Sequence, residues 1–290
     1  MEERGRAEIL NVEQDSLLLD YLLTHLKNKS KNNIKSILSR GSVFVDNKPI
    51  TKFDYKLRKG QIIEIRQILK NYKNTISIIY EDNDLVVVDK PDGLLSIATD
   101  KESTNTAYHL VREHIRIRNP KGHIFVVHRL DRDTSGILVF AKNEKIKNML
   151  QDNWNDIVTI RGYVAIVEGQ FDKANGTIKS WLKENKAKMV YSSNRPHDGD
   201  LAITHYQVLR TNDKYSLVDI RLDTGRKNQI RVHMKDLGHS VIGDKKYGSK
   251  SDPLKRLGLH ANVLEFKHPI SKKVMHFEVP IPDSFNKLVK

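Results

Sequence analysis

The segment from residue 128 to residue 141 combines side chains that could do chemistry with a strand that could hold them. Its first part contains two aspartates, two arginines, a threonine and a serine, and ends at Gly136, before the apolar run 137–141. A charged loop at a strand edge is a suitable wall for a cleft, where an ionised carboxylate could act as nucleophile or base. An aspartate beside an arginine is more often a structural ion pair or a turn former, so the pattern alone leaves both interpretations open.

A second candidate segment, residues 222–239, carries an arginine beside an apolar helical face. The positions of this face recur at helical spacing: Ile230, His233, Met234 and Leu237. Asn228 suits the N-cap of the helix and Gly238 its C-terminal end. Arg231 either extends to solvent or pairs through both arms of its guanidinium with a carboxylate in a cleft. The second arrangement would keep that carboxylate ionised and oriented.

Several classes of site are excluded by what the sequence lacks. The 290 residues include no cysteine, which excludes disulfide scaffolds, zinc ribbons, iron–sulfur sites and catalytic thiols. The 12 histidines show no HExxH or similar ligand spacing. The GxSxG, GxGxxG and GxxxxGK[ST] motifs are also missing. We therefore expect chemistry by oxygen and nitrogen side chains, without a metal ion.

The charge of the chain indicates a polyanionic partner. Lys and Arg number 50 against 36 Asp and Glu, a net charge of +14, and binding to phosphates releases counterions. Residues 1–22 hold six acids and two arginines, whereas residues 23–75 hold thirteen basic residues and three acids. No apolar run approaches the roughly 20 residues that span a bilayer. We expect a cytoplasmic protein that binds nucleic acid rather than a membrane.

The basic stretch predicts a small α+β module. Its expected elements are two helices, the first part of a hairpin and a strand: residues 17–26, 33–39, 42–50 and 61–69. Asp15 is the expected N-cap of the first helix, and the hairpin turns at Asp46 and Asn47. Residues 70–77 are polar without periodicity and predict a linker. A solvated basic face would explain the charge run equally well.

The rest of the chain predicts one large α+β domain. Short β-rich runs such as HIFVVHRL, GILVFAK and GYVAIVEG dominate, and residues 143–154 give the best helical pattern. Strict alternation of strands and helices is absent, which favours a mixed, mainly antiparallel sheet. We therefore expect an α+β protein with two domains, residues 1–72 and 73–290.

HRLDRDTSG, residues 128–136, resembles the central motif HRLDxxTSG of the RluA family of RNA pseudouridine synthases. Further segments resemble that family in order over nearly the whole chain: YEDNDLVVVDKPDGLL, GYVAIVEG, AITHYQVL, TGRKNQIRVHM, GHSVIGDKKYG and RLGLHANVLEFKHP. ILSRGSVFVDNKPI is similar to the helix-to-hairpin signature of the RNA-binding domain named after ribosomal protein S-four. The resemblance implies a pseudouridine synthase catalytic domain preceded by an S-four-like domain, as in many members that modify large-subunit ribosomal RNA.

The resemblance also implies roles by position. Asp131 matches the family's catalytic aspartate, Arg231 the arginine that pairs with it, and Tyr163 the tyrosine that packs against the target base. Arg129 matches an arginine that contacts or enters the RNA, and Leu259 is expected to line the uracil pocket.

Two further points concern RNA contacts. The basic residues of the first domain that we expect to bind RNA are Lys35, Arg40, Lys48 and Lys52. Asn228 departs from the family, in which many members have histidine, so a histidine contact to RNA is in doubt here.

The function implied is the isomerisation of specific uridines in structured RNA to pseudouridine. The base–ribose C–N bond breaks, the uracil turns, and its C5 joins the same sugar carbon, so no cofactor or metal is required. We expect ribosomal RNA as substrate and rRNA processing as the setting, and the resemblance implies a monomer. The alternatives are a synthase that acts on transfer RNA, a non-catalytic RNA-binding factor in ribosome assembly, and a general polyanion binder.

Overall fold

The computed structural model describes residues 8–290 except 28, 40, 66–75, 100–101 and 103–104. The chain divides into two compact units, residues 1–73 and 74–290. The predicted domain boundary after residue 72 and most of the predicted linker lie outside the described residues. No described helix is long and apolar enough to cross a membrane.

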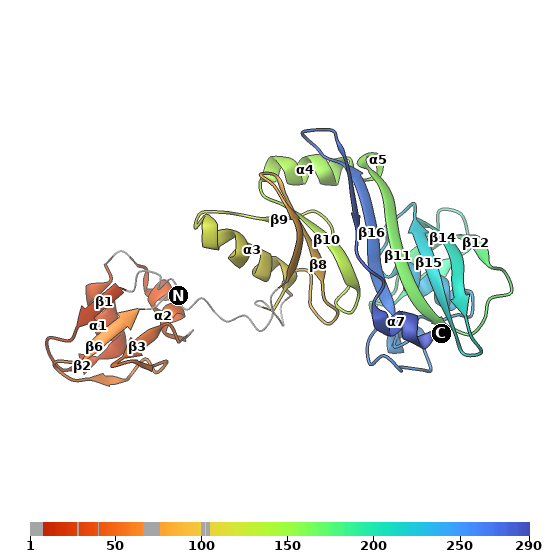
Figure 1. The fold of residues 1–290 in the computed structure, drawn as a ribbon. Helices are drawn as coiled ribbons and strands as arrows, with labels where there is room; N and C mark the ends of the chain where they lie inside the picture. Colours follow the sequence, from red (N-terminus) through yellow and green to blue (C-terminus); the bar gives the residue numbers. More distant parts are fainter. Residues whose placement is uncertain (1–7, 28, 40, 66–75, 100–101, 103–104) are drawn as a thin grey trace. The chain divides into compact units, whose positions relative to one another are not determined.

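The smaller unit packs two helices against short strands (Figure 1). Its elements are β1 (Glu8–Asn11), β2 (Ser16–Leu17), α1 (Leu18–His25), α2 (Lys31–Ser39), β3 (Val43–Val45), β4 (Lys48–Pro49), β5 (Lys56–Leu57) and β6 (Ile62–Ile65). Four strands pair in the order β1-β6-β3-β4, and β2 pairs with β5. The core side chains come from both helices and the sheet: Leu18, Leu22, Leu26, Ile34, Leu38, Val43, Val45 and Ile63.

The local predictions for this unit are largely confirmed. Both helices form, and the hairpin turns at Asp46 and Asn47, whose φ angles of 49° and 66° are the left-handed values of a two-residue turn. The capping prediction for Asp15 is wrong, because the N-cap of α1 is Leu17. The Asp15 carboxylate instead accepts a hydrogen bond from the Lys59 backbone N–H at 2.8 Å. The last residues of the predicted strand 61–69 lie outside the described residues.

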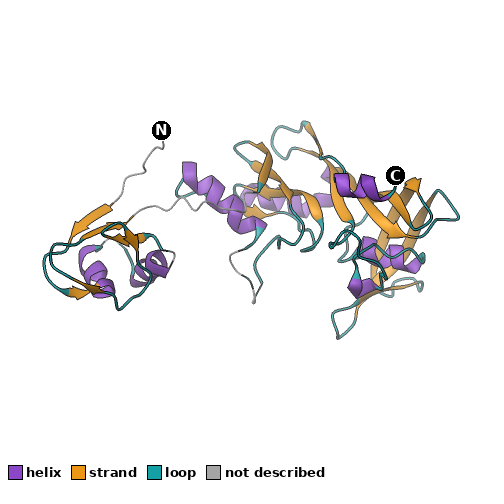
Figure 2. Ribbon diagram, turned by 60° about the horizontal axis from the view of Figure 1, so that its bottom comes forward, coloured by secondary structure: helices purple, strands orange, loops and turns teal. Residues whose placement is uncertain are grey.

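The larger unit is built on one long sheet with helices beside it (Figure 2). Its first elements are β7 (Ser77–Glu81), β8 (Leu85–Lys90), α3 (Ala107–Arg118), β9 (Phe125–Val126), β10 (Ser135–Ala141), α4 (Glu144–Asp152), α5 (Trp154–Ile157) and β11 (Val158–Glu168). The remaining ones are β12 (Asn175–Glu184), β13 (Val190–Ser193), β14 (Asp200–Thr211), β15 (Tyr215–Leu222), α6 (Gln229–Asp236), the 3-10 turn η1 (Lys245–Tyr247), β16 (Leu259–Lys267), β17 (Val274–Glu278) and α7 (Asp283–Leu288).

The sheet is mixed and mainly antiparallel, as predicted. Nine strands follow the order β13-β12-β14-β15-β11-β16-β10-β8-β7, while β17 and β9 pair with β16 and β10. Among the described strands, β10 and β16 form the one parallel pair, with Ser135 opposite His260 and Gly136 opposite Ala261. The fold is therefore α+β. The predicted helix over 143–154 is α4, which Asn143 caps by accepting from the Ile146 N–H, followed by the short α5.

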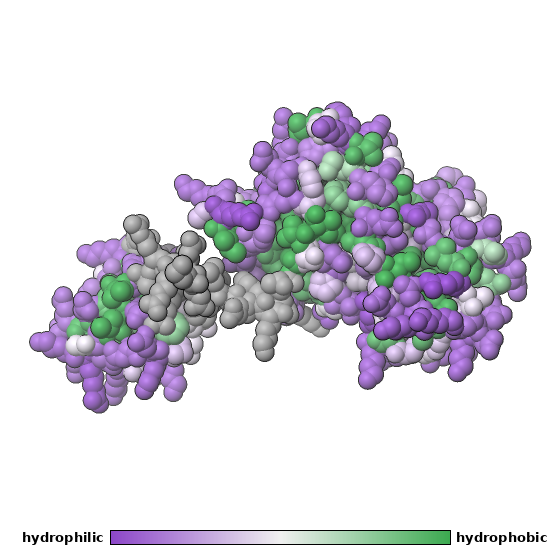
Figure 3. Space-filling model, viewed as in Figure 1, coloured by the Kyte–Doolittle hydropathy of each residue, from purple (hydrophilic) through white to green (hydrophobic). Residues whose placement is uncertain are grey.

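Hydrophobic residues gather at the surface in the middle of the larger unit, among hydrophilic ones (Figure 3). Below the surface, buried side chains of the strands β8, β10 and β16 pack together with those of α4: Val87, Val139 and Phe266 from the strands, Ile146 and Leu150 from the helix. A second cluster ties β11 and β15 to α6 through Val218, Ile220, Ile230 and Met234. The polar loops at the ends of β10 and β15 are thus held by rigid elements.

Candidate active site

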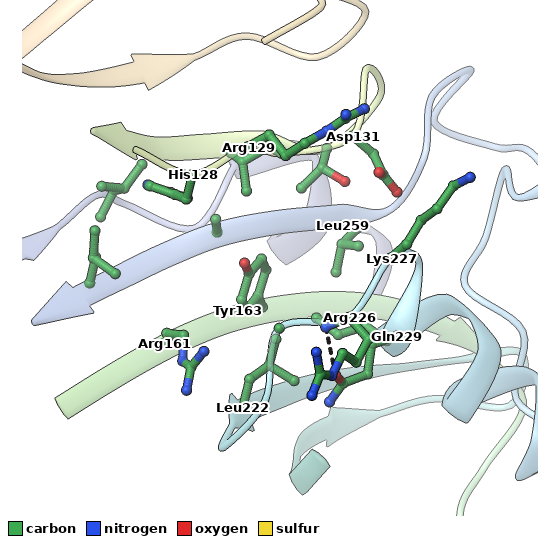
Figure 4. Close-up of a pocket in the computed structure, with 18 of the residues that line it drawn as sticks. His128, Arg129, Asp131, Arg161, Tyr163, Leu222, Arg226, Lys227, Gln229 and Leu259 are labelled. Atoms are coloured by element: carbon green, nitrogen blue, oxygen red, sulfur yellow. Dashed lines mark hydrogen bonds between the residues drawn. The ribbon is translucent and has the colours of Figure 1, made fainter. Parts of the chain in front are cut away.

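A cavity of about 660 Å³ lies over β10, β16 and β11 and extends to the start of α6. Figure 4 shows Asp131 on the loop before β10, Leu259 on β16 and Tyr163 on β11, all toward the same space. Arg129 and Arg231 also line the cavity. The structure therefore brings together the five residues of the larger unit to which the sequence analysis assigned a role.

The loop that carries Asp131 is tied down on both sides of it. The Ser96 hydroxyl donates to the Leu130 carbonyl at 2.7 Å and accepts from the Leu130 N–H at 3.1 Å. Lys90 Nζ donates to the carbonyl of Arg132 at 2.9 Å. Asp131 has little freedom to shift its backbone, although its side chain remains 31% exposed to the cavity.

Lys90 is fully buried, and its ammonium group donates hydrogen bonds to backbone carbonyls rather than to a carboxylate. Its ammonium also donates to the carbonyls of Pro91 and Leu94 at 2.9 and 2.8 Å, so all three of its protons are used. Burial lowers the pKa of Lys90 to about 8, because desolvation disfavours the charged form. The sequence analysis gave this residue no role.

Gly136 ends the HRLDRDTSG segment for a steric reason. Its φ of 111° disfavours other residues, and a Cβ atom there would lie 2.1 Å from the carbonyl oxygen of Ala261 on the neighbouring strand. Only glycine lets β10 run this close to β16. The motif therefore fixes the loop of Asp131 against the strand that carries Leu259.

Arg231 joins two carboxylates. Its Nε and Nη2 donate to the two oxygens of Asp244 at 2.7 and 2.8 Å, and its Nη1 donates to Asp131 at 3.1 Å. Arg231 therefore does pair with Asp131, but through one nitrogen, and the carboxylate that it binds with both arms of the guanidinium is Asp244. The Asp244 side chain is completely buried, whereas that of Asp131 is exposed to the cavity. The bidentate hydrogen bonds of Arg231 therefore go to the carboxylate that is shielded from water. Burial alone would lower the pKa of Arg231. The hydrogen bonds to Asp244 and the negative charges of Asp244 and Asp131 outweigh burial and raise this pKa.

Asn228 supports the same arginine instead of capping the helix. It occupies the N-cap position of α6 with a φ of 55°, but its side chain makes no capping bond, which contradicts the predicted capping role. Its amide oxygen accepts from Arg231 at 3.0 Å and its amide nitrogen donates to the Tyr247 hydroxyl at 2.9 Å. The Tyr247 ring lies 4.9 Å below the guanidinium of Arg231. Gly238, with a φ of 85°, ends the helix as expected.

Tyr163 and Leu259 face the cavity from neighbouring strands. Burial, with the nearby charge of Asp131, raises the pKa of Tyr163 to about 12, so its hydroxyl stays neutral. Leu259 is buried and makes an apolar wall. A flat ring and an aliphatic wall beside a carboxylate can hold a pyrimidine between them.

Cations surround the opening. Arg129 is exposed and has no hydrogen-bond partner among the described residues, which leaves its guanidinium available. Arg161, Arg226 and Lys227 also line the cavity (Figure 4). The sequence analysis gave none of them a role, although Arg226 and Lys227 lie in the segment TGRKNQIRVHM. Positive charge around a concave site favours a polyanionic chain.

The other predicted RNA contacts belong to the smaller unit. Lys35 on α2, Lys48 on β4 and Lys52 are exposed, while Arg40 lies outside the described residues. Within the described part of the chain, no group of three or more His, Asp or Glu side chains could hold a metal ion.

Sequence reasoning missed Asp244, the main partner of Arg231. Asp244 lies in the segment GHSVIGDKKYG, which resembles the family, but the resemblance did not distinguish Asp244 from the other residues of that segment. Asp244 is 13 positions from Arg231, at the N-cap of η1, where its carboxylate also accepts from the Tyr247 N–H at 3.2 Å. The pair between Arg231 and Asp244 forms because the fold brings the two residues together, and their spacing in the sequence does not predict it.

Comparison with known proteins gives a consistent result. A family model described as RNA pseudouridylate synthase matches residues 84–236. The uncharacterized RNA pseudouridine synthase YhcT of Bacillus subtilis is 32% identical over 99% of this chain and 97% of its own. The ribosomal large subunit pseudouridine synthase D of Borreliella burgdorferi is 34% identical over 86% of this chain and 78% of its own. The solved structure of human RNA pseudouridylate synthase domain containing 4 shares the fold, with a TM-score of 0.60 and 22% identity, over 72% of this chain and 90% of that one.

Proposed function

Because the chain belongs to the RNA pseudouridylate synthase family, we propose that it converts uridines of large-subunit ribosomal RNA to pseudouridine with Asp131 as the catalytic residue. The chain is an RNA pseudouridine synthase, an isomerase that acts on RNA. The choice of ribosomal RNA is supported by relatives named ribosomal large subunit pseudouridine synthase D, from Buchnera aphidicola and Borreliella burgdorferi.

The reaction requires a group that can act on a flipped-out nucleotide without a cofactor. The glycosidic C–N bond breaks, the uracil turns within the pocket, and C5 forms the new bond to the same ribose carbon. A carboxylate can attack the sugar, attack the base or remove a ribose proton, and each role needs its ionised form next to the nucleotide. In the cavity of this chain, Asp131 is the carboxylate that lines the space.

The single observation that carries this assignment is the chain of contacts from Asp244 through Arg231 to Asp131. A buried carboxylate holds the guanidinium with two bonds, and the guanidinium offers its remaining nitrogen to Asp131 at 3.1 Å. This leaves Asp131 with positive charge beside it and one oxygen without a side-chain donor among the described residues. Such an aspartate is oriented and still free to react.

The remaining residues handle the nucleotide. Tyr163 offers its ring to the target base, Leu259 closes the pocket with an apolar surface, and Arg129 contacts the RNA at the opening. The exposed lysines of the smaller unit, Lys35 and Lys48 among them, bind the phosphates of an adjoining RNA segment in the manner of an S-four-like domain.

Pseudouridine mapping of total RNA tests this function. Cells with and without the gene are compared, and the deletion is complemented with the wild-type chain or with Asp131→Asn. We expect specific large-subunit ribosomal RNA positions to lose pseudouridine and to regain it with the wild type alone. Lost positions confined to transfer RNA would contradict the substrate assignment. An unchanged map would contradict the proposal as a whole, and full rescue by Asp131→Asn would contradict the role of the aspartate.

A further inference from the structure

We infer that the end of the cavity beside α5 binds a second nucleotide, the neighbour of the target uridine in the same RNA strand. Its phosphate would bind Arg161 and its base would stack on Trp154. This inference rests on the proposed function, because it takes the end beside Asp131 as the place of the target base. It adds a second recognition site to the cleft.

The cavity is longer than one base needs. Its volume is about 660 Å³ and its lining includes Trp154 and Gln151 as well as Asp131 and Leu259, and cavities of roughly 300–1,000 Å³ enclose whole drug-sized ligands. Figure 4 shows Arg161 toward one side of the view and Asp131 toward the other, with Tyr163 between them. α5 leads directly into β11, so Trp154 belongs to the Arg161 end of that strand.

Arg161 is a cation without an acid partner. It is half-buried, and its guanidinium donates to the backbone carbonyl of Asp223, while no carboxylate among the described residues forms an ion pair with it. Three other cations of the cleft do have acid partners: Arg231 binds Asp244, Lys227 binds Glu184 and Arg226 lies 3.8 Å from Asp200. Arg129 also forms no ion pair among the described residues, but it is exposed to solvent whereas Arg161 is half-buried. Burial lowers the pKa of Arg161, and the raising effects of Tyr163 and Asp223 only partly offset this. A phosphate would provide the missing negative charge.

Trp154 supplies an aromatic surface at the same end. It is half-buried against the core below β10 and lines the cavity. Its ring lies 4.9 Å from that of His128, whose Nε2 accepts a hydrogen bond from the Val139 N–H at 3.1 Å. His128 is therefore neutral, and burial lowers its pKa to about 4. Unstacked RNA bases bind on such uncharged aromatic surfaces.

The two tryptophans of the chain allow a direct measurement. Trp181 lies on β12 outside the cavity lining, so a Trp181→Phe protein reports on Trp154 alone. Asp131→Asn is added so that no turnover occurs. The first probe is a single-stranded RNA 9-mer with one central uridine flanked by adenosines. The second is the same RNA with abasic riboses on both sides of the uridine.

The inference predicts that the first probe quenches Trp154 emission and binds about tenfold more tightly than the second. A Trp154→Leu substitution should remove the difference in affinity between the probes, whereas Trp154→Phe should keep most of it. Equal affinity for both probes, or an emission of Trp154 that neither probe changes, would overturn the inference.

Arg161→Gln tests the phosphate contact separately. Its affinity for the first probe should fall about tenfold at low salt, and the slope of log K against log salt should shrink by about 0.7, the value for one phosphate contact in a single strand. Lys173→Gln removes the same charge from an exposed position and should leave the slope unchanged. An unchanged slope in Arg161→Gln would refute the contact. Uridine conversion by the wild type, measured in parallel, reports on the proposed function independently of these binding results.

Discussion

Replacing Asp244 with asparagine tests how the active site is held together. The substitution keeps the shape of the side chain but removes the charge that accepts bonds of 2.7 and 2.8 Å from Arg231. Removal of one partner from a buried ion pair costs about 3–5 kcal/mol of stability. Arg231 keeps its bond to Asp131 and is 14% exposed, so we expect the lower end, about 3 kcal/mol. For a unit of this size that is a fall in melting temperature of about 6–12 °C.

The same substitution should slow the reaction. Asparagine offers one acceptor oxygen in place of two, so Arg231 is held less rigidly by its remaining contacts with Asn228 and Tyr247, and its bond of 3.1 Å to Asp131 is less well oriented. Small misplacements of reacting groups cost up to about 100-fold in rate, so we expect kcat to fall about 10- to 100-fold while KM changes less than about threefold. Unfolding by calorimetry and single-turnover conversion of RNA measure the two effects.

Asp92→Asn is the matched control. Asp92 accepts one bond of 2.9 Å from Arg256, and its carboxylate is 41% exposed, so its loss should cost less than about 1 kcal/mol and leave kcat unchanged. A stable Asp244→Asn protein with normal turnover would refute the reasoning. A destabilised Asp244→Asn protein with normal kcat would show that this carboxylate supports the fold without orienting Asp131.

Three further predictions concern stability and RNA binding. His233 and His260 are buried with pKa values lowered to about 4, whereas unfolded histidines protonate near 6.5, so stability present above pH 6.5 should fall as the pH drops toward 4. By pH 5 the loss should be about 2 kcal/mol for each, and equal free energies of unfolding in urea at pH 7 and pH 5 would contradict this. Lys90→Met leaves one buried and two partly buried carbonyls without their donor, including that of Arg132, and should lower both stability, by about 2 kcal/mol, and kcat. Normal turnover by Lys90→Met would argue against a role for this lysine in holding the loop. Deletion of residues 1–73 should weaken binding to structured RNA and reduce its salt dependence while the larger unit still folds, and unchanged affinity and site choice would contradict the assignment of the smaller unit to RNA binding.

The parts of the site that depend on short stretches of sequence were predictable. The HRLDRDTSG segment indicated Asp131 and the strand behind it, and the structure explains its glycine by the approach of β10 to Ala261. The absence of strict alternation between strands and helices likewise predicted a mainly antiparallel sheet. Local patterns of this kind follow from the geometry of a single strand or turn.

The parts that depend on distant contacts were not predictable. Asp15 and Asn228 both look like helix caps, yet each bonds a group that the fold brings to it, the Lys59 N–H in one case and Arg231 in the other. Asp244 carries no local mark of its role for the same reason. The parallel pairing of β10 with β16 joins segments more than a hundred residues apart, and no pattern within either strand specifies the partner.

The most direct test of the central claim is single-turnover conversion of uridine by Asp131→Asn beside Asp133→Asn. Asp133 lies in the same loop, is exposed, and forms no hydrogen bond or ion pair among the described residues, so it controls for the loss of one charge there. With total RNA from cells lacking the gene as substrate, we expect Asp133→Asn to keep at least about half of the wild-type rate and Asp131→Asn to lose at least about 10⁴-fold. Appreciable pseudouridine formation by a pure, folded Asp131→Asn protein would contradict the account.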